Sequence, residues 1–151
     1  MLRYPDPHCL AVLEAVHRSE DSQRFSGKAL TVKCFEDNSR IKELSQTPGE
    51  GRVLVVDGGG STRFALCGDL IAMDLQKNGW AGIVIFGCVR DTAVLATVLI
   101  GIKAIGAHPR KTARQNEGQV GVRLEIGGIV VDTGDSVIAD EDGVLLLPAA
   151  G

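Results

Sequence analysis

The sequence predicts a layered α/β domain built on a mixed β-sheet. Two continuous apolar runs, RVLVV at residues 52–56 and GIVIF at residues 82–86, are typical of strands that are covered on both faces. Strand-like and helical segments alternate in the first half of the chain, whereas the second half is mostly strand-like. This change of pattern favours a mixed sheet over a plain doubly wound fold.

Three segments have the spacing or the end signals of helices. Apolar residues at helical spacing predict an amphipathic helix over residues 7–20. Asn38 is expected to N-cap a short helix. Another helix is expected over residues 66–78, with Leu70 and Met73 among its apolar positions, and a short helical stretch after the second buried strand.

Strands account for most of the remaining chain, and two turn signals join pairs of them. Gly127-Gly128 predicts a hairpin, and Asp142-Gly143 predicts another. The expected strands are residues 29–34, 52–56, 82–86, 101–107, 119–126, 129–131, 136–139 and 144–147.

Composition limits the class of protein. A chain of 151 residues is expected to form one domain, residues 1–151, and its 44% hydrophobic and 23% charged residues exclude disorder for most of its length. A net charge of −3 and an aromatic share of 4% argue against direct binding of nucleic acid. The longest apolar stretch, residues 93–102, is too short to span a bilayer. With no visible secretory signal and four scattered cysteines, we expect a cytoplasmic protein with reduced thiols.

The first buried strand runs into Asp57-Gly-Gly-Gly-Ser61. Three successive glycines permit a sharp turn whose N–H groups could face an anion. The segment matches neither a Walker A loop nor GxGxxG, so a purely structural turn is the favoured interpretation.

The second buried strand runs into Arg90-Asp91, which is the pair of residues that most strongly indicates a ligand-binding or catalytic site. An arginine presents a fixed fork to a carboxylate, and an adjacent aspartate can hold a hard divalent cation. Together they suit a 2-oxo acid that is bound through its carboxylate and ketone. A surface ion pair is the alternative, and the position directly after a buried strand favours the functional interpretation.

Other charged residues carry weaker signals. Asp69 could serve the helix dipole or a catalytic role equally well. The basic cluster of residues 103–114 is interpreted mainly as a solvated face, and the acidic residues of 132–142 as turn chemistry. No histidine has a companion at metal-ligand spacing.

Six ordered motifs resemble the RraA-like family, which includes regulators of ribonuclease E activity and the 4-hydroxy-4-methyl-2-oxoglutarate aldolases. The latter are class II pyruvate aldolases that also decarboxylate oxaloacetate. The motifs are LTVKCFEDN (30–38), GRVLVVDGGGS (51–61), GDLIA (68–72), NGWAGIVIFGCVRD (78–91), GIKAIGAHPRK (101–111) and GDSVIADEDGV (134–144).

The resemblance implies a swivelling β/β/α domain that assembles as a ring-shaped homotrimer with sites at subunit boundaries. It also implies a divalent cation, Mg²⁺ or Mn²⁺. By matching motifs, Gly68, Asp69, Leu70 and Ile71 would line the substrate pocket. Arg90 would contact pyruvate, Asp91 would bind the metal, and Asp69 would act through a water on that metal.

Two functions from different classes follow. The first is a metal-dependent carbon–carbon lyase that acts on 2-oxo acids such as oxaloacetate and releases pyruvate through a metal-stabilised enolate. The second is a trimeric regulator that binds and inhibits ribonuclease E or an associated RNA helicase. The aldolase pattern has an acidic residue where this chain has Val94, but Asp91 is retained and favours the lyase.

Overall fold

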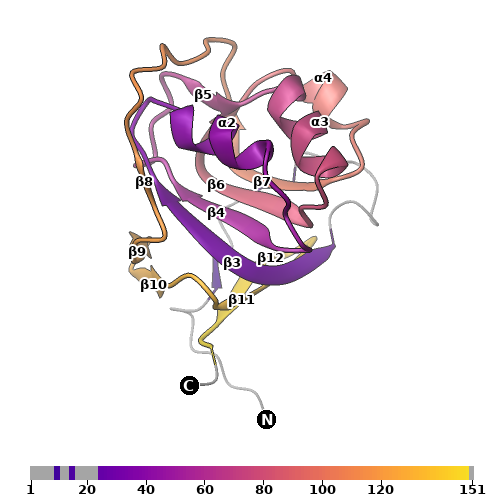
Figure 1. Cartoon of the computed structure of the whole chain (residues 1–151), viewed down its shortest axis with the longest axis vertical. Helices are drawn as coiled ribbons and strands as arrows, with labels where there is room; N and C mark the ends of the chain where they lie inside the picture. The colour runs from indigo at the N-terminus through magenta and orange to yellow at the C-terminus, as the bar shows by residue number, and fades with distance from the viewer. Residues whose placement is uncertain (1–8, 11–13, 16–23, 150–151) are drawn as a thin grey trace.

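The computed structural model describes residues 9–10, 14–15 and 24–149 and has three layers. The helices of this described part cover one face of the central sheet, and short strands cover part of the other face (Figure 1). The elements are β1 (Cys9–Leu10), β2 (Glu14–Ala15), β3 (Phe25–Lys33), α2 (Ser39–Ser45), β4 (Val53–Asp57), β5 (Ala65–Cys67), α3 (Asp69–Lys77), β6 (Gly82–Val89), α4 (Thr92–Leu95), β7 (Gly101–Ala107), β8 (Gln119–Val120), β9 (Leu124–Ile126), β10 (Ile129–Val131), β11 (Ser136–Asp140) and β12 (Gly143–Leu147).

Four parallel strands in the order β3-β4-β6-β7 form the centre of the sheet. β4 is buried on both faces. Its Leu54 and Val56 belong to the core that includes residues of the helices, and its Val53 and Val55 belong to a second core shared with β9 to β12. The uninterrupted apolar run is thereby explained, because every side chain of Val53–Val56 needs an apolar partner.

The second half of the chain supplies the antiparallel part of the sheet. β11 pairs with β3 and with β12, and the β11–β12 turn closes on the Asp140–Gly143 pair as predicted. β9 and β10 form the other predicted hairpin. Gly127 and Gly128 at its turn have φ values of 57° and 81°, in the left-handed region that glycine adopts without strain. The expected α/β domain with a mixed sheet is confirmed.

The helix predicted over residues 7–20 is wrong where the structure describes that segment. Cys9–Leu10 pairs with β12, and Glu14–Ala15 pairs antiparallel with β7, at the two ends of the sheet order. Pairing with open strand edges outweighs the helical spacing of the apolar residues. The other residues of the predicted helix lie outside the described part of the chain.

Two further boundaries differ from the sequence prediction. Ala65–Cys67 is strand β5, because it pairs with the end of β6, and α3 begins only at Asp69. The strand expected over residues 119–126 is divided into β8 and β9 around Gly121, whose φ is 79°. Among the helices of the described residues, none has the length and apolar character needed to cross a membrane.

Candidate functional site

Two loops meet at the carboxyl edge of the central sheet and form the candidate site. β5 pairs in parallel with the end of β6, and the Arg90 amide donates to the Cys67 carbonyl at 2.9 Å. The start of α3 at Gly68 and Asp69 therefore lies against the segment that leads into α4. Carboxyl ends of parallel strands are the usual place for ligands in open α/β sheets.

Gly68 is the point of closest approach between these loops. A Cβ placed on Gly68 would lie 2.9 Å from Oδ2 of Asp91 and 3.0 Å from Nε of Arg90. The φ of Gly68 is −122°, which any residue can adopt. Glycine is therefore required here for space rather than for its backbone freedom.

Asp91 occupies a left-handed position, with φ 58° and ψ 41°, immediately before α4. Its carbonyl accepts hydrogen bonds from the amides of Val94 and Leu95, which starts the helix. Its Oδ2 lies 3.4 Å from the Asp69 amide and 3.5 Å from Nη1 of Arg90. The two adjacent charges are thus turned toward Gly68 and the start of α3, and each side chain is 32% exposed.

A cavity of about 300 Å³ opens beside Gly68, and its charged lining residues are all basic. Three of the four predicted pocket residues, Gly68, Leu70 and Ile71, line it together with Arg90. Asp69 and Asp91 do not line it but lie next to Gly68 at its edge. The remaining lining residues are Asn38, Lys42, Lys111, Thr112 and Arg114.

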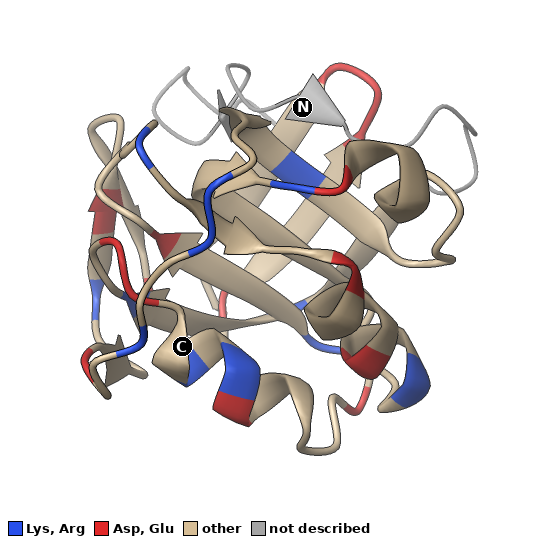
Figure 2. Ribbon diagram, turned by 90° about the horizontal axis from the view of Figure 1, so that it is seen from above, with Lys and Arg blue, Asp and Glu red and all other residues tan. Residues whose placement is uncertain are grey.

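Two basic residues after β7, Lys111 and Arg114, are exposed, as the interpretation as a solvated face predicted, and they also line this cavity. They lie on the loop that joins β7 to β8. Figure 2 shows basic residues, in blue, on several segments of the face seen from above. The interpretation as a solvated face is wrong for Lys103, since it is fully buried and donates to the Asp140 carbonyl. Burial lowers the pKa of Lys103, against the opposing influence of the acidic residues 140–142.

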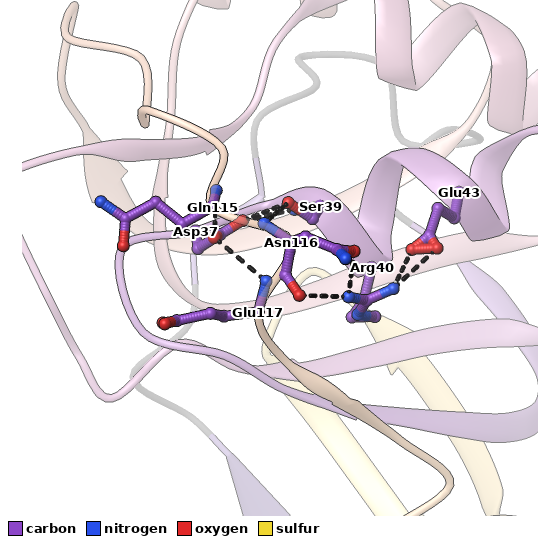
Figure 3. A network of polar contacts seen from close by, with 7 residues as sticks. All are labelled: Asp37, Ser39, Arg40, Glu43, Gln115, Asn116 and Glu117. Atoms are coloured by element: carbon purple, nitrogen blue, oxygen red, sulfur yellow. Dashed lines mark hydrogen bonds and ion pairs between the residues drawn. The ribbon is translucent and has the colours of Figure 1, made fainter.

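The loop with Lys111 and Arg114 is fastened to the start of α2 (Figure 3). Asp37, which is 3% exposed, accepts from the Ser39 amide and hydroxyl at 2.8 and 2.5 Å. Its other oxygen accepts from the amides of Gln115 and Glu117 at 2.7 and 3.3 Å. Burial alone would raise the pKa of Asp37, but these hydrogen bonds outweigh it and lower the pKa. The carboxylate therefore stays ionised and holds the loop at neutral pH.

The Asn38 prediction is right in position and wrong in mechanism. α2 begins directly after Asn38, but the Asn38 side chain makes no capping hydrogen bond. Asp37 accepts from the Ser39 amide instead, and the Asn38 amide group turns toward the cavity, where it contacts Thr112 and Arg114.

The glycine-rich segment is a structural turn, as favoured from the sequence. The amides of Gly58 and Gly60 both donate to the Phe86 carbonyl, and the Gly59 amide donates to Oδ1 of Asp57. The Ser61 amide donates to the carbonyl of Gly58. These N–H groups are used within the fold, so the segment offers no cradle for an anion.

Within the described residues, the thiols of Cys34 and Cys67 and the acidic turns do not form a second reactive centre. Burial, followed by the charges of Asp37 and Asp57, raises the pKa of Cys34 to about 12, and burial raises that of Cys67 to about 12. Thiols with such pKa values are poor nucleophiles at neutral pH. The acidic residues of 132–142 serve turns, as predicted, and two of them also form ion pairs. Asp132 pairs with Arg123, and Oδ1 of Asp140 accepts from the Asp142 amide.

Comparison with known proteins agrees with this architecture. The family model described as RraA-like, Aldolase/RraA, matches residues 9–146. The chain belongs to the RraA-like family. A protein of Alkalilimnicola ehrlichii that carries the provisional name 4-hydroxy-4-methyl-2-oxoglutarate aldolase is 54% identical over 123 residues, which cover 82% of this chain and 76% of that protein. A similarly named protein of Pseudomonas putida is 45% identical over 147 residues, and the match covers 97% of this chain and 89% of that protein.

Solved structures of this RraA-like fold include proteins described in different terms. The RNA-processing inhibitor RraA from Thermus thermophilis has a TM-score of 0.89 and 42% identity, and the match covers 95% of this chain and 86% of that chain. A Geobacillus kaustophilus protein described as S-adenosylmethionine:2-dimethylmenaquinone methyltransferase has a TM-score of 0.86 and 40% identity. That match covers 91% of this chain and 83% of the other chain.

Sequence reasoning found one side of the cavity and missed the other. Gly68 and Arg90 were identified, but Lys42, Asn38 and the loop residues were not assigned to the site. The signal that could have found Lys111 and Arg114 is their position just after a strand of the parallel sheet, because such loops gather at the ligand-binding edge.

Proposed function

We propose that this RraA-like protein is a divalent-metal-dependent lyase that cleaves a carbon–carbon bond in 2-oxo dicarboxylic acids and releases pyruvate. The observation that carries the proposal is a cavity whose charged lining is entirely basic, next to the Arg90-Asp91 pair at Gly68. The names of the bacterial relatives as 4-hydroxy-4-methyl-2-oxoglutarate aldolases support the same reaction class.

Arg90 is the proposed catalytic cation. In oxaloacetate, the C3–C4 bond breaks, carbon dioxide leaves and negative charge moves to the C2 oxygen. A guanidinium fork in the cavity stabilises that developing charge without a need to titrate. A proton must then reach C3 to form pyruvate, and we assign Asp69 to position the water that delivers it. Retro-aldol cleavage passes through the same charge distribution, so both reactions suit one site.

The residues present fit a cation that keeps much of its own water. No cluster of three or more His, Cys, Asp or Glu residues suited to a metal occurs in the described part of the chain. Asp91, with Asp69 close by, is the available carboxylate, and Mg²⁺ and Mn²⁺ accept one or two carboxylates together with water and substrate oxygens. A divalent cation held by Asp91 would polarise the substrate carbonyl as a Lewis acid.

The other basic residues of the cavity would take the second carboxylate of the substrate. Lys42, Lys111 and Arg114 line the same cavity as Arg90. Among the described residues, none of these three forms an ion pair. Oxaloacetate and 4-hydroxy-4-methyl-2-oxoglutarate each carry two carboxylates, so their charge matches this lining.

The decisive experiment measures Mg²⁺-stimulated pyruvate release from oxaloacetate. We expect activity in the wild type with Mg²⁺ or Mn²⁺, loss on chelation, recovery on adding metal back, and at least a hundredfold loss in Asp91→Ala. Asp132→Ala is the matched control, because Asp132 is an exposed aspartate paired with Arg123 away from the cavity. Equal rates in the wild type, Asp91→Ala and a protein-free blank would reject the proposal.

A second candidate role is regulation of ribonuclease E, in which the chain binds the enzyme as a homotrimeric ring. The observation that favours it is the structural match to the Thermus RNA-processing inhibitor. Exposed apolar side chains on and near α3 and α4 provide a surface for such assembly: Leu70, Met73, Val94 and Leu99.

Retention on immobilised ribonuclease E, titrated with salt, tests this role. If regulation is the function, the wild type and Arg90→Ala bind alike, because the contact does not need the cavity. Absence of binding at low salt would eliminate the regulatory role and leave the lyase proposal unaffected.

A further inference from the structure

Asn38 is a buried amide whose hydrogen bonds join three separate segments beside the cavity. The residue is 6% exposed. Its Nδ2 donates to the Leu66 carbonyl at 3.0 Å, next to the start of α3. Its Oδ1 accepts from Oγ1 of Thr112 at 3.0 Å and from Nε of Arg114 at 3.0 Å. One side chain thus ties the beginning of α2 to β5 and to the loop after β7.

The bond to Arg114 differs in kind from the other two. Leu66 and Thr112 are buried, so bonds to them satisfy polar groups of the interior. Arg114 lies on an exposed stretch of loop and lines the cavity. A long exposed side chain has high rotamer entropy, and a hydrogen bond at Nε restricts the plane of the guanidinium. The Nη groups stay available for a ligand.

The backbone around Arg114 is already fixed without Asn38. Asp37 accepts from the amides of Gln115 and Glu117, and Arg40 donates to the carbonyl and side chain of Asn116. The contact from Asn38 is therefore not needed to anchor the loop as such. Its specific effect is on the direction of one side chain.

We propose that Asn38 is a positioning residue that aims the Arg114 guanidinium into the cavity, and that this contact gives the site its preference for a substrate with a second carboxylate. The inference rests on the proposed function and deepens it, because it assigns the discrimination between 2-oxo dicarboxylates and 2-oxo monocarboxylates. Asn38 acts through Arg114 and does not itself touch the reacting atoms.

The test compares two non-cleavable ligands of equal chain length, 2-oxoglutarate and 2-oxopentanoate, by titration calorimetry with Mg²⁺ present. We expect the wild type to prefer 2-oxoglutarate. Asn38→Ala should weaken 2-oxoglutarate binding roughly tenfold, the scale of one charge-assisted hydrogen bond, and leave 2-oxopentanoate binding nearly unchanged. In an Arg114→Ala background, Asn38→Ala should have no additional effect on either ligand.

Two further variants separate positioning from a structural role. Asn78→Ala removes another amide-to-backbone bond, from Nδ2 of Asn78 to the Ser45 carbonyl, and should lower the melting temperature without changing the ligand preference. Arg114→Lys keeps the charge at an exposed position but loses the Nε bond to Asn38. It should lose most of the preference, which keeps the inference testable if Asn38→Ala does not fold.

Three outcomes would overturn the inference: full preference in Arg114→Lys, additive effects in the double variant, or equal weakening of both ligands in Asn38→Ala. These outcomes are independent of turnover. Preserved ligand preference without pyruvate release would defeat the proposed lyase function alone, whereas pyruvate release without any ligand preference would defeat this inference alone.

Discussion

Arg90→Ala is expected to lower kcat/KM for pyruvate release from oxaloacetate by about 10²–10³, the loss typical for removing one preorganised donor to a developing oxyanion. The side chain lines the cavity, and its Nε lies 3.0 Å from the position of a Cβ placed on Gly68. Because the side chain is about a third exposed, its removal should change the melting temperature little. The rate is measured by coupling pyruvate to lactate dehydrogenase, after subtraction of spontaneous decarboxylation.

Two companion variants define what Arg90 contributes. Arg90→Lys keeps the charge but loses the planar fork, so an intermediate rate is expected. Arg123→Ala removes an exposed arginine paired with Asp132 and should leave the rate unchanged. A wild-type rate in Arg90→Ala would show that the chemistry occurs elsewhere or that the protein is not a lyase.

Gly68→Ala is expected to reduce the same rate by about a hundredfold while the protein stays folded. The added methyl group would lie 2.9 Å from Oδ2 of Asp91, 3.0 Å from Nε of Arg90 and 3.2 Å from its Cζ. All three atoms belong to the far ends of flexible side chains, so these ends move and the backbone does not. A displacement of about 1 Å at reacting groups can cost about two orders of magnitude in rate.

Gly106→Ala is the matched control for this change. The nearest atom to a Cβ at Gly106 is Sγ of Cys88 at 3.7 Å, an ordinary van der Waals distance, and Gly106 lies on β7. Gly106→Ala should therefore retain full activity. If Gly68→Ala kept the wild-type rate, the approach of Arg90 and Asp91 to Gly68 would have no catalytic meaning.

The sheet could be predicted well because its signals are local. An apolar run such as RVLVV reports that both faces of a strand are covered, and Gly127-Gly128 reports a turn that needs positive φ. The helix over residues 7–20 failed because the described parts of that segment pair with β12 and β7, which lie far along the chain. The spacing of apolar residues within one segment carries no information about unpaired strand edges that other parts of the chain provide.

The same division applies to the cavity. Gly68 was identified because it belongs to a motif of the resembled family, and Arg90 because it belongs to such a motif and also follows a predicted strand. Lys42 and Arg114 were not, because one lies on a helix and the other on a loop some 70 residues later, brought together through Asp37 and Asn38. Leu70 and Met73, which are among the apolar positions of the predicted helix, are 62% and 43% exposed, and Leu70 lines the cavity as the resemblance implied.

By itself, the sequence determined the family, the mixed sheet and the pairing of an arginine with an aspartate at a strand end. The sequence signals for these properties lie in residues that are neighbours in the chain, so hydrophobic periodicity and motif spacing predict them directly. Only the tertiary structure decided that Arg90 shares a cavity with Lys42, Lys111 and Arg114. Folding brings distant segments of the chain to one edge of the sheet. The electrostatic fields of their basic residues then add through space, so that these residues act as a single binding site.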